Sequence, residues 1–236
     1  MISSNIRNIR LLNEVDNSVR LIKKGFSELQ HINCADTPYH IPILLISSGF
    51  ERLMKCIICY WHLKKNKKYP SNKRLRELGH RLDILLQEIV DICKQFGNYD
   101  NRKATTEDLD FLKNNKRLHN IIRILSEFAD GGRYYNLDIV SQGNSEYSEP
   151  EDKWREFETE IIKEDPEFAE LIKNPAKSDE MYDKINKVLM TYLERFARAL
   201  SRIFTLGELH PDAKRCYSYI SDFLNIMDKD LGVKKY

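Results

Sequence analysis

The chain has 236 residues, of which 42% are hydrophobic and 31% charged, and its formal net charge is +2. This length can bury a large core, and only 9 glycines and 7 prolines favour long helices over a many-turned sheet. The most apolar run, 41–46, is too short to cross a bilayer, and the first turns lack the apolar core of a signal peptide. We therefore expect a cytoplasmic protein with no membrane segment.

The first predicted element is a helix over residues 4–32. Its apolar residues recur at alternating steps of three and four, as in a helix that packs along another helix: Leu12, Val15, Val19, Ile22, Phe26 and Leu29. A turn over 33–36 ends this helix. Thr37 then suits an N-cap and Pro38 a first helical position, so the next helix is expected to begin there.

The second predicted helix, about 38–64 and at most to residue 66, is apolar around nearly its whole circumference. A narrow polar strip of Glu51, Lys55 and His62 is the exception. A helix that is apolar all round in a globular chain lies in the middle of a bundle. Glu51 and Lys55 have the i, i+4 order that favours an ion pair, which serves either the fold or the lining of a ligand cleft.

A strongly basic segment follows the second helix. Residues 52–81 hold ten Lys or Arg and one acid, Glu77, whereas 146–183 hold fourteen acids and five bases. We expect 64–76 to be a loop, and a basic loop attracts polyanions unless it is simply a solvated face. The candidate nucleic-acid-binding residues in it are Lys64, Lys65, Lys67, Lys68, Lys73 and Arg76.

Three further helices are predicted before residue 130. An amphipathic helix starts near Gly79-His80, runs to Phe96 and is stopped by Gly97-Asn98. Residues 105–108, Thr-Thr-Glu-Asp, have the pattern of a capping box that opens a short helix. Residues 118–128 carry the apolar spacing of another helix.

After a break at Gly131-Gly132, the chain carries Arg133, Tyr134 and Tyr135. Two aromatic rings beside an arginine can stack nucleic-acid bases, or the tyrosines can form the edge of the core. The polar loop 142–148 is the best candidate boundary. It divides a bundle over 1–141 from a C-terminal helical extension over 149–236, unless the two form one continuous domain.

The C-terminal part is also predicted to be helical. Pro150 and Pro166 mark two helix starts, and a long helix spans 178–206. A last helix opens at His210-Pro211 and carries Tyr217, Ile220, Leu224, Met227 and Leu231. No strand pattern and no fixed repeat is present. The predicted fold class is therefore all-α, a helical bundle around the apolar second helix.

Two stretches resemble the HEPN superfamily of small prokaryotic helical bundles. Ser48–Cys56 is similar to that group's helix with a Glu and a Lys four residues on, and Gly79–Leu86 is similar to its His-x-Leu-x-x-Leu-Leu helix start. The resemblance covers roughly 60 residues closely and about the first 140 loosely. It implies a protein that is often dimeric and is either a metal-independent ribonuclease or an inactive relative, in toxin–antitoxin or phage-defence systems.

The resemblance also suggests a catalytic pair. HEPN ribonucleases use an Arg-x4–6-His motif, in which the His moves a proton from the ribose 2′-OH and the Arg neutralises phosphorane charge. Arg74 and His80, with five residues between them, match this spacing, whereas Arg117-Leu118-His119 does not. His80 also matches the fold-marking His of the superfamily's earlier helix. Arg74 and His80 are therefore either a catalytic pair or a phosphate-attracting loop and a helix-start His.

No cofactor or metal is expected. The five cysteines are scattered, and Cys56 and Cys59 lack the second ligand pair of a zinc site, which favours buried thiols. We expect a HEPN-like cytoplasmic protein that binds RNA, as an effector or regulator in bacterial stress or phage defence, with a homodimer or protein partner. The alternatives are a metal-independent ribonuclease, or a non-catalytic subunit that docks on a partner through 146–183.

Overall fold

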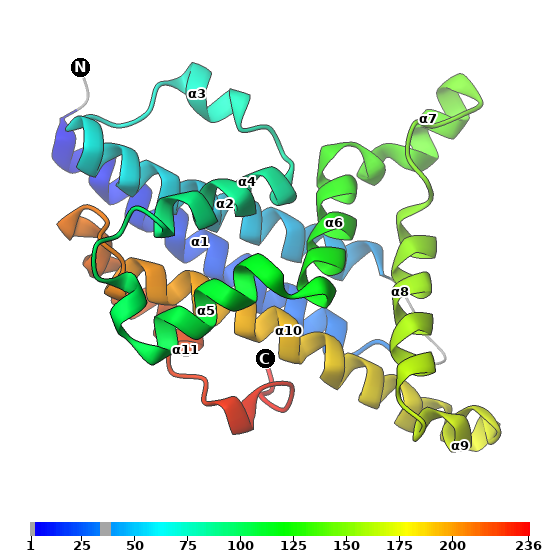
Figure 1. Cartoon of the computed structure of the whole chain (residues 1–236). Helices are drawn as coiled ribbons and strands as arrows, with labels where there is room; N and C mark the ends of the chain where they lie inside the picture. Colours follow the sequence, from blue (N-terminus) through cyan, green and yellow to red (C-terminus); the bar gives the residue numbers. More distant parts are fainter. Residues whose placement is uncertain (1–2, 34–38) are drawn as a thin grey trace.

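The computed structural model describes residues 3–33 and 39–236, and it confirms the all-α prediction because no strand occurs in those ranges. The helices, shown in Figure 1, are α1 (Ser4–Gln30), α2 (His40–Asn66), α3 (Asn72–Glu77), α4 (Leu82–Cys93), α5 (Lys103–Asn114), α6 (Lys116–Asp130), α7 (Tyr135–Gln142), α8 (Pro150–Glu164), α9 (Phe168–Ile172), α10 (Ser178–Leu206) and α11 (Tyr217–Leu224). Short 3-10 turns join several of them.

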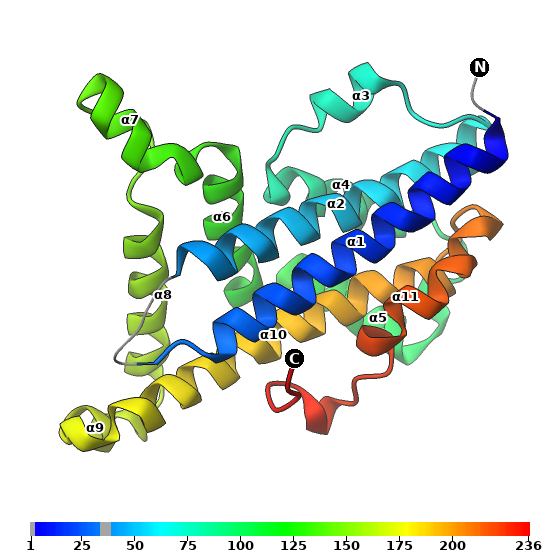
Figure 2. The same ribbon diagram turned by 180° about the vertical axis from the view of Figure 1, so that it is seen from behind.

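Helix α2 is the centre of the bundle, as its apolar circumference predicted. It packs against α1, α4, α6 and α10, and Figure 2 shows α1 running alongside it. The fully buried Phe50 of α2 lies between two other rings, with centroid distances of 6.2 Å to Phe26 of α1 and 4.7 Å to Phe196 of α10. Burial of this apolar surface is the main favourable term for the fold.

Helices α1 and α2 approach each other closely at two glycines. A Cβ atom on Gly25 would lie 2.6 Å from Ile46 Cγ1, and one on Gly49 would lie 2.6 Å from Ile22 Cγ1. The same two hypothetical atoms would lie 3.0 Å from the backbone nitrogens of those isoleucines. Each helix thus offers a glycine to the other helix's isoleucine, which fixes the spacing of the pair that carries the candidate site.

The C-terminal segment shares the core of the first helices. Phe223 of α11 lies 5.9 Å from Phe26, and Phe204 of α10 lies 6.2 Å from Tyr60 of α2, both between ring centroids. Trp154 of α8 is fully buried. Helix α7 differs, because none of its residues is buried and it projects from the end of the bundle at which α2 begins (Figures 1 and 2).

Two helix starts differ from the sequence prediction or lie outside the described ranges. Thr37 and Pro38 are not among the described residues, and the first helical residue of α2 is His40. The capping box predicted at 105–108 is wrong, because α5 already begins at Lys103 after the extended residue Arg102. The Thr105 hydroxyl instead donates to the carbonyl oxygens of Tyr99 and Arg102, and so ties α5 to the preceding turn.

The last helix and the basic loop also differ from the prediction. Helix α11 ends at Leu224, because Arg198 holds the next segment by donating to Ile226 O at 2.8 Å and to Asp228 Oδ1 at 2.6 Å. Met227 is consequently exposed rather than part of a helix face. The predicted loop 64–76 is shorter, since α2 continues to Asn66 and α3 forms within it.

Candidate anion-binding cleft

The connection between α2 and α4, residues 67–81, forms one wall of a cleft. Lys67 ends α2 in the left-handed region (φ 56°), and its N–H donates to Leu63 O. The Ser71 side chain then accepts the N–H of Arg74 at 3.1 Å and so caps α3. Gly79, at φ 60°, turns the chain toward α4. Local backbone preferences thus shape this wall, which we call the α3 wall.

Side chains of the bundle hold the α3 wall at both ends. Near its start, the His62 ring hydrogen-bonds to Lys68 O through Nδ1 at 2.8 Å. Near its end, Lys55 donates from Nζ to Gly79 O at 2.6 Å. In its middle, Arg74 Nη2 contacts both carboxylate oxygens of Glu88 on α4, at 2.6 and 2.7 Å. Helices α2 and α4 therefore fix the position of the wall.

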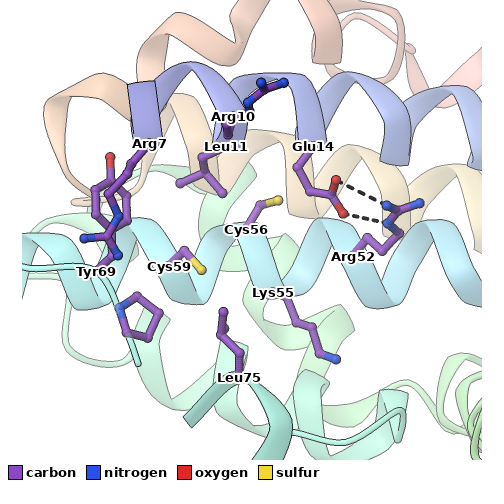
Figure 3. Close-up of a pocket in the computed structure, with 11 residues that line it drawn as sticks. Arg7, Arg10, Leu11, Glu14, Arg52, Lys55, Cys56, Cys59, Tyr69 and Leu75 are labelled. Carbon is purple, nitrogen blue, oxygen red and sulfur yellow. Dashed lines mark hydrogen bonds and ion pairs between the residues drawn. The ribbon is translucent and has the colours of Figure 1, made fainter. Parts of the chain in front are cut away.

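A cavity of about 470 Å³ lies between α1, α2 and the α3 wall. Figure 3 shows Arg7 and Tyr69 at one end and the Glu14–Arg52 pair at the other, with the cysteine side chains between them. The apolar side chains that line it are Leu11, Cys56, Cys59, Pro70 and Leu75. The volume is in the usual range for small-molecule sites, which are mostly apolar with a few polar groups.

The cations around the cavity fall into two groups. Arg52 pairs with Glu14 (Nε to Oε1, 2.6 Å), and Lys55 pairs with Glu51 (Nζ to Oε1, 2.7 Å). Arg7 instead lies over the Tyr69 ring, 4.4 Å from its centroid. Among the side chains that the structure describes, no carboxylate is at ion-pair distance from Arg7 or from Arg10, the other cation on α1 that lines the cavity. The α1 side of the cleft therefore carries uncompensated positive charge.

The two cysteines of the cavity are neutral thiols. Burial raises the pKa of Cys59 to about 12 and also raises the pKa of Cys56 well above its usual value. Both are free thiols, as is the buried Cys216. Cys56 and Cys59 are thus apolar lining at neutral pH, and no thiolate repels an anion in the cleft.

Glu51, Lys55 and His80 form one network at the back of the α3 wall. Glu51 is only 9% exposed, and besides Lys55 it faces His80, whose Nδ1 lies 3.1 Å from both carboxylate oxygens. The His80 side chain is half exposed. Lys55 lines the cavity, whereas Glu51 is not among its lining residues. The structure thus joins the Glu51–Lys55 pair, which the sequence indicated by its i, i+4 spacing, to His80, which the sequence singled out separately.

The structure does not join Arg74 to His80. The Arg74 guanidinium is held by Glu88, and the His80 ring is held by Glu51. No hydrogen bond links Arg74 and His80 in the part of the chain that the structure describes. His80 also precedes α4, which begins at Leu82, so it is not within that helix.

Most of the predicted nucleic-acid-binding lysines have no acidic partner. Lys65 lies over the Trp61 ring, 4.7 Å from its centroid, and Lys73 is 3.9 Å from Glu77. Within the described ranges, no carboxylate is at ion-pair distance from a group that we call the free cations: Lys64, Lys65, Lys67, Lys68 and Arg76. All of these except the half-buried Lys64 are exposed.

Arg133, Tyr134 and Tyr135 lie apart from this cleft. Arg133 and Tyr134 lie between α6 and α7, Tyr135 is the first residue of α7, and none of the three lines the cavity. The Arg133 guanidinium is 5.0 Å from the Tyr134 ring centroid, and the Tyr134 side chain is half exposed. These residues therefore belong to the end of the molecule from which α7 projects (Figure 1).

Sequence reasoning missed the α1 contribution to the cleft. Arg7 and Arg10 are spaced i, i+3 on one face of α1, a signal that is visible in the sequence. That face could not be assigned a role, because only the fold shows that the α3 wall lies against it.

Two further kinds of site were sought in residues 3–33 and 39–236. No group of three or more His, Cys, Asp and Glu side chains there could hold a metal ion. None of the helices described has the length and apolar character needed to cross a membrane. In comparisons with family models, curated proteins and solved structures, nothing matches this chain.

Proposed function

We propose that this protein binds RNA through the free cations at the end of α2 and on the α3 wall. The observation that carries the proposal is that Lys64, Lys65, Lys67, Lys68 and Arg76 lack carboxylate partners in the described chain. Unpaired surface cations displace counterions from a phosphate backbone, which is the main source of affinity for nucleic acids without sequence preference. The position of these cations on a wall held by α2 and α4 supports a preformed surface.

The resemblance of 48–56 and 79–86 to HEPN proteins supports RNA in particular as the polyanion. It also supports a role as an effector or regulator in bacterial stress or phage defence, in a homodimer or with a protein partner. Genes for defence proteins beside this one would support that role, and a comparison of RNA with DNA of the same sequence would test the ligand.

The test is a double charge reversal, Lys67→Glu with Lys68→Glu, measured by fluorescence anisotropy with a labelled single-stranded RNA. We expect affinity to fall by more than about tenfold, and the slope of log K against log salt to become shallower by about 1.4, because two phosphate contacts are lost. The matched control is Lys113→Glu with Lys116→Glu, two exposed lysines at the α5–α6 junction. Equal losses in the two variants, or binding that does not change with salt, would refute the proposal.

A second candidate function is metal-independent RNA cleavage, and the contact between His80 and Glu51 favours it. A carboxylate on Nδ1 orients the ring and leaves Nε2 to accept the 2′-OH proton as the 2′ oxygen attacks the phosphorus. The bond from phosphorus to the 5′ oxygen breaks and that oxygen takes a proton from water, so the products are a cyclic phosphate and a 5′-OH. Arg74 would have to break its ion pair with Glu88 in order to bind the phosphate.

Cleavage is tested by incubating RNA with the protein and a chelator. The ribonuclease proposal predicts a 2′,3′-cyclic phosphate product that is lost in His80→Ala, with RNA binding retained. Glu51→Gln is expected to lower the rate and to change its pH profile, because the amide orients the ring without its charge. Cleavage that survives in His80→Ala would remove His80 from the site, and absence of cleavage by the wild type would leave binding alone.

A further inference from the structure

We infer that the cavity between α1, α2 and the α3 wall binds a small amphipathic anion, with one acidic head group and an apolar body. This inference goes beyond RNA binding and does not require it. It depends on three observations: uncompensated cations on one side of the cavity, an apolar lining, and walls that are fixed without a ligand.

The head group would meet the α1 side of the cavity. Arg7 has no carboxylate partner among the described residues, and its guanidinium is already oriented by the face of Tyr69. Arg10 lies one turn further along α1 and is exposed, and in Figure 3 its guanidinium points away from the two cysteine side chains. A guanidinium that lacks an internal partner and lies at the mouth of a cavity is suited to a carboxylate or phosphate.

The other two cations that line the cavity, Arg52 and Lys55, already have carboxylate partners and are not expected to bind the acidic head group. Arg52 is neutralised by Glu14, and Lys55 is neutralised by Glu51 while it also binds Gly79 O. Because these pairs are already made, Arg7 and Arg10 are the cations without a carboxylate partner among the described residues that line the cavity. The ligand therefore has a single acidic head that points to α1.

The apolar body would lie on Leu11, Cys56, Cys59 and Leu75. Because burial keeps the thiols neutral, this surface carries no charge at neutral pH. A purely inorganic anion would leave this apolar surface exposed to water. A ring or a short acyl chain would cover it, and each Å² of apolar surface buried would add about 25 cal/mol to the binding free energy. The cavity volume of about 470 Å³ suits such a body.

The cavity is already formed without a ligand, so binding should cost little conformational entropy. The Arg74–Glu88 pair, the Lys55–Gly79 hydrogen bond and the His62–Lys68 hydrogen bond hold the α3 wall in place. A preorganised site loses less conformational entropy on binding than a mobile one.

The probe is 8-anilinonaphthalene-1-sulfonate, an aromatic anion that fluoresces in apolar sites, titrated into the full-length protein. We expect binding that falls at least about tenfold in Arg7→Glu with Arg10→Glu, because the head-group contacts are charge-assisted. The control with the same charge change is Lys113→Glu with Lys116→Glu, which should bind normally. Leu75 is a half-buried residue of the α3 wall, and its replacement by the larger Trp should fill the cavity. We therefore expect the Leu75→Trp variant not to bind the probe.

Competition identifies the source of the anion. Displacement by octanoate alone indicates an acyl acid, and displacement by adenosine monophosphate alone indicates a nucleoside phosphate. Displacement by neither, or equal displacement by inorganic phosphate, overturns the inference, as does unchanged binding in both the double arginine variant and Leu75→Trp. Lys67→Glu with Lys68→Glu should bind the probe normally, so failure of RNA binding and failure of this site give different results.

Discussion

Two regions of the molecule each bury a carboxylate, and they stabilise it in opposite ways. In the cleft, Glu51 is surrounded by donors, with Lys55 at 2.7 Å and His80 at 3.1 Å. Where α8 packs near the start of α2, Glu158 is 5% exposed and accepts a hydrogen bond from the Tyr39 hydroxyl at 2.9 Å. Burial raises the pKa of Glu158 to about 7.

The two buried acids differ in the charge of their partners. Glu51 has a cationic partner that meets the cost of its burial, and the same network orients His80 and fixes Gly79. Removal from water raises the pKa of Glu158 more than the neutral donors Tyr39 and Trp154 and the charge of Arg155 lower it, which favours the protonated form. The Glu51 network suits a site that binds anions, because its Lys55 and His80 are held in place. The Glu158 site makes the stability of the α8 region depend on pH.

The largest expected effect is on the pH dependence of stability. Because the folded-state pKa of Glu158 is raised above its unfolded value, the folded state binds more protons between about pH 4.5 and pH 7, and the free energy of unfolding falls as pH rises through that window. The fall attributable to Glu158 is about 3 kcal/mol. Glu158→Gln keeps a hydrogen-bond acceptor for Tyr39 and should abolish this fall in the free energy of unfolding. Urea unfolding at about pH 5 and about pH 8 measures it.

Glu156→Gln, on an exposed face of the same helix, is the control for this prediction. It should leave the pH dependence of unfolding unchanged. If Glu158→Gln lost stability between the two pH values as steeply as the wild type, the carboxylate of Glu158 would not be the group responsible.

A smaller effect is expected in the cleft. Lys55→Met leaves Glu51 mostly buried without its cation and removes the donor to Gly79 O, so we expect a loss of about 2 kcal/mol. Arg52→Met breaks the Glu14 pair, in which both side chains are more than a third exposed, and should cost less than about 1 kcal/mol. Urea unfolding of the two variants at neutral pH measures both values. Equal losses would mean that the Glu51 network is no more than a surface pair.

Much of the fold followed from the sequence, because helix periodicity and proline position are local. The apolar circumference of α2 predicted its central position, and the bounds of α10 were predicted as residues 178–206. The capping box at 105–108 failed because Thr105 bonds back to Tyr99, a contact that depends on the preceding turn. The last helix was extended too far because Arg198, 28 residues away from Ile226, holds the chain after Leu224.

The candidate site was less predictable, because most of its contacts join residues that are far apart in the sequence. Glu51 and Lys55 could be paired from their spacing, but the contact of His80 with Glu51 spans 29 residues and requires the fold. The partner of Arg74 is Glu88 on α4, which no motif indicated. Side chains of the cavity come from α1, α2 and the α3 wall, so their juxtaposition is a property of helix packing and not of sequence spacing.

A last effect separates the hydrogen bond of Glu158 from its burial. Tyr39→Phe removes a donor that lowers the pKa of Glu158 while leaving its burial, which raises the pKa, in place. At about pH 5, where folded Glu158 is protonated, we expect a loss of about 1 kcal/mol, the usual net value of one hydrogen bond. At about pH 8 the loss should be larger, because hydrogen bonds to a charged acceptor are stronger. Urea unfolding of Tyr39→Phe at the two pH values tests this. A loss that is larger at the acidic value would mean that the protonated acid, and not the carboxylate, is the form that Tyr39 stabilises more.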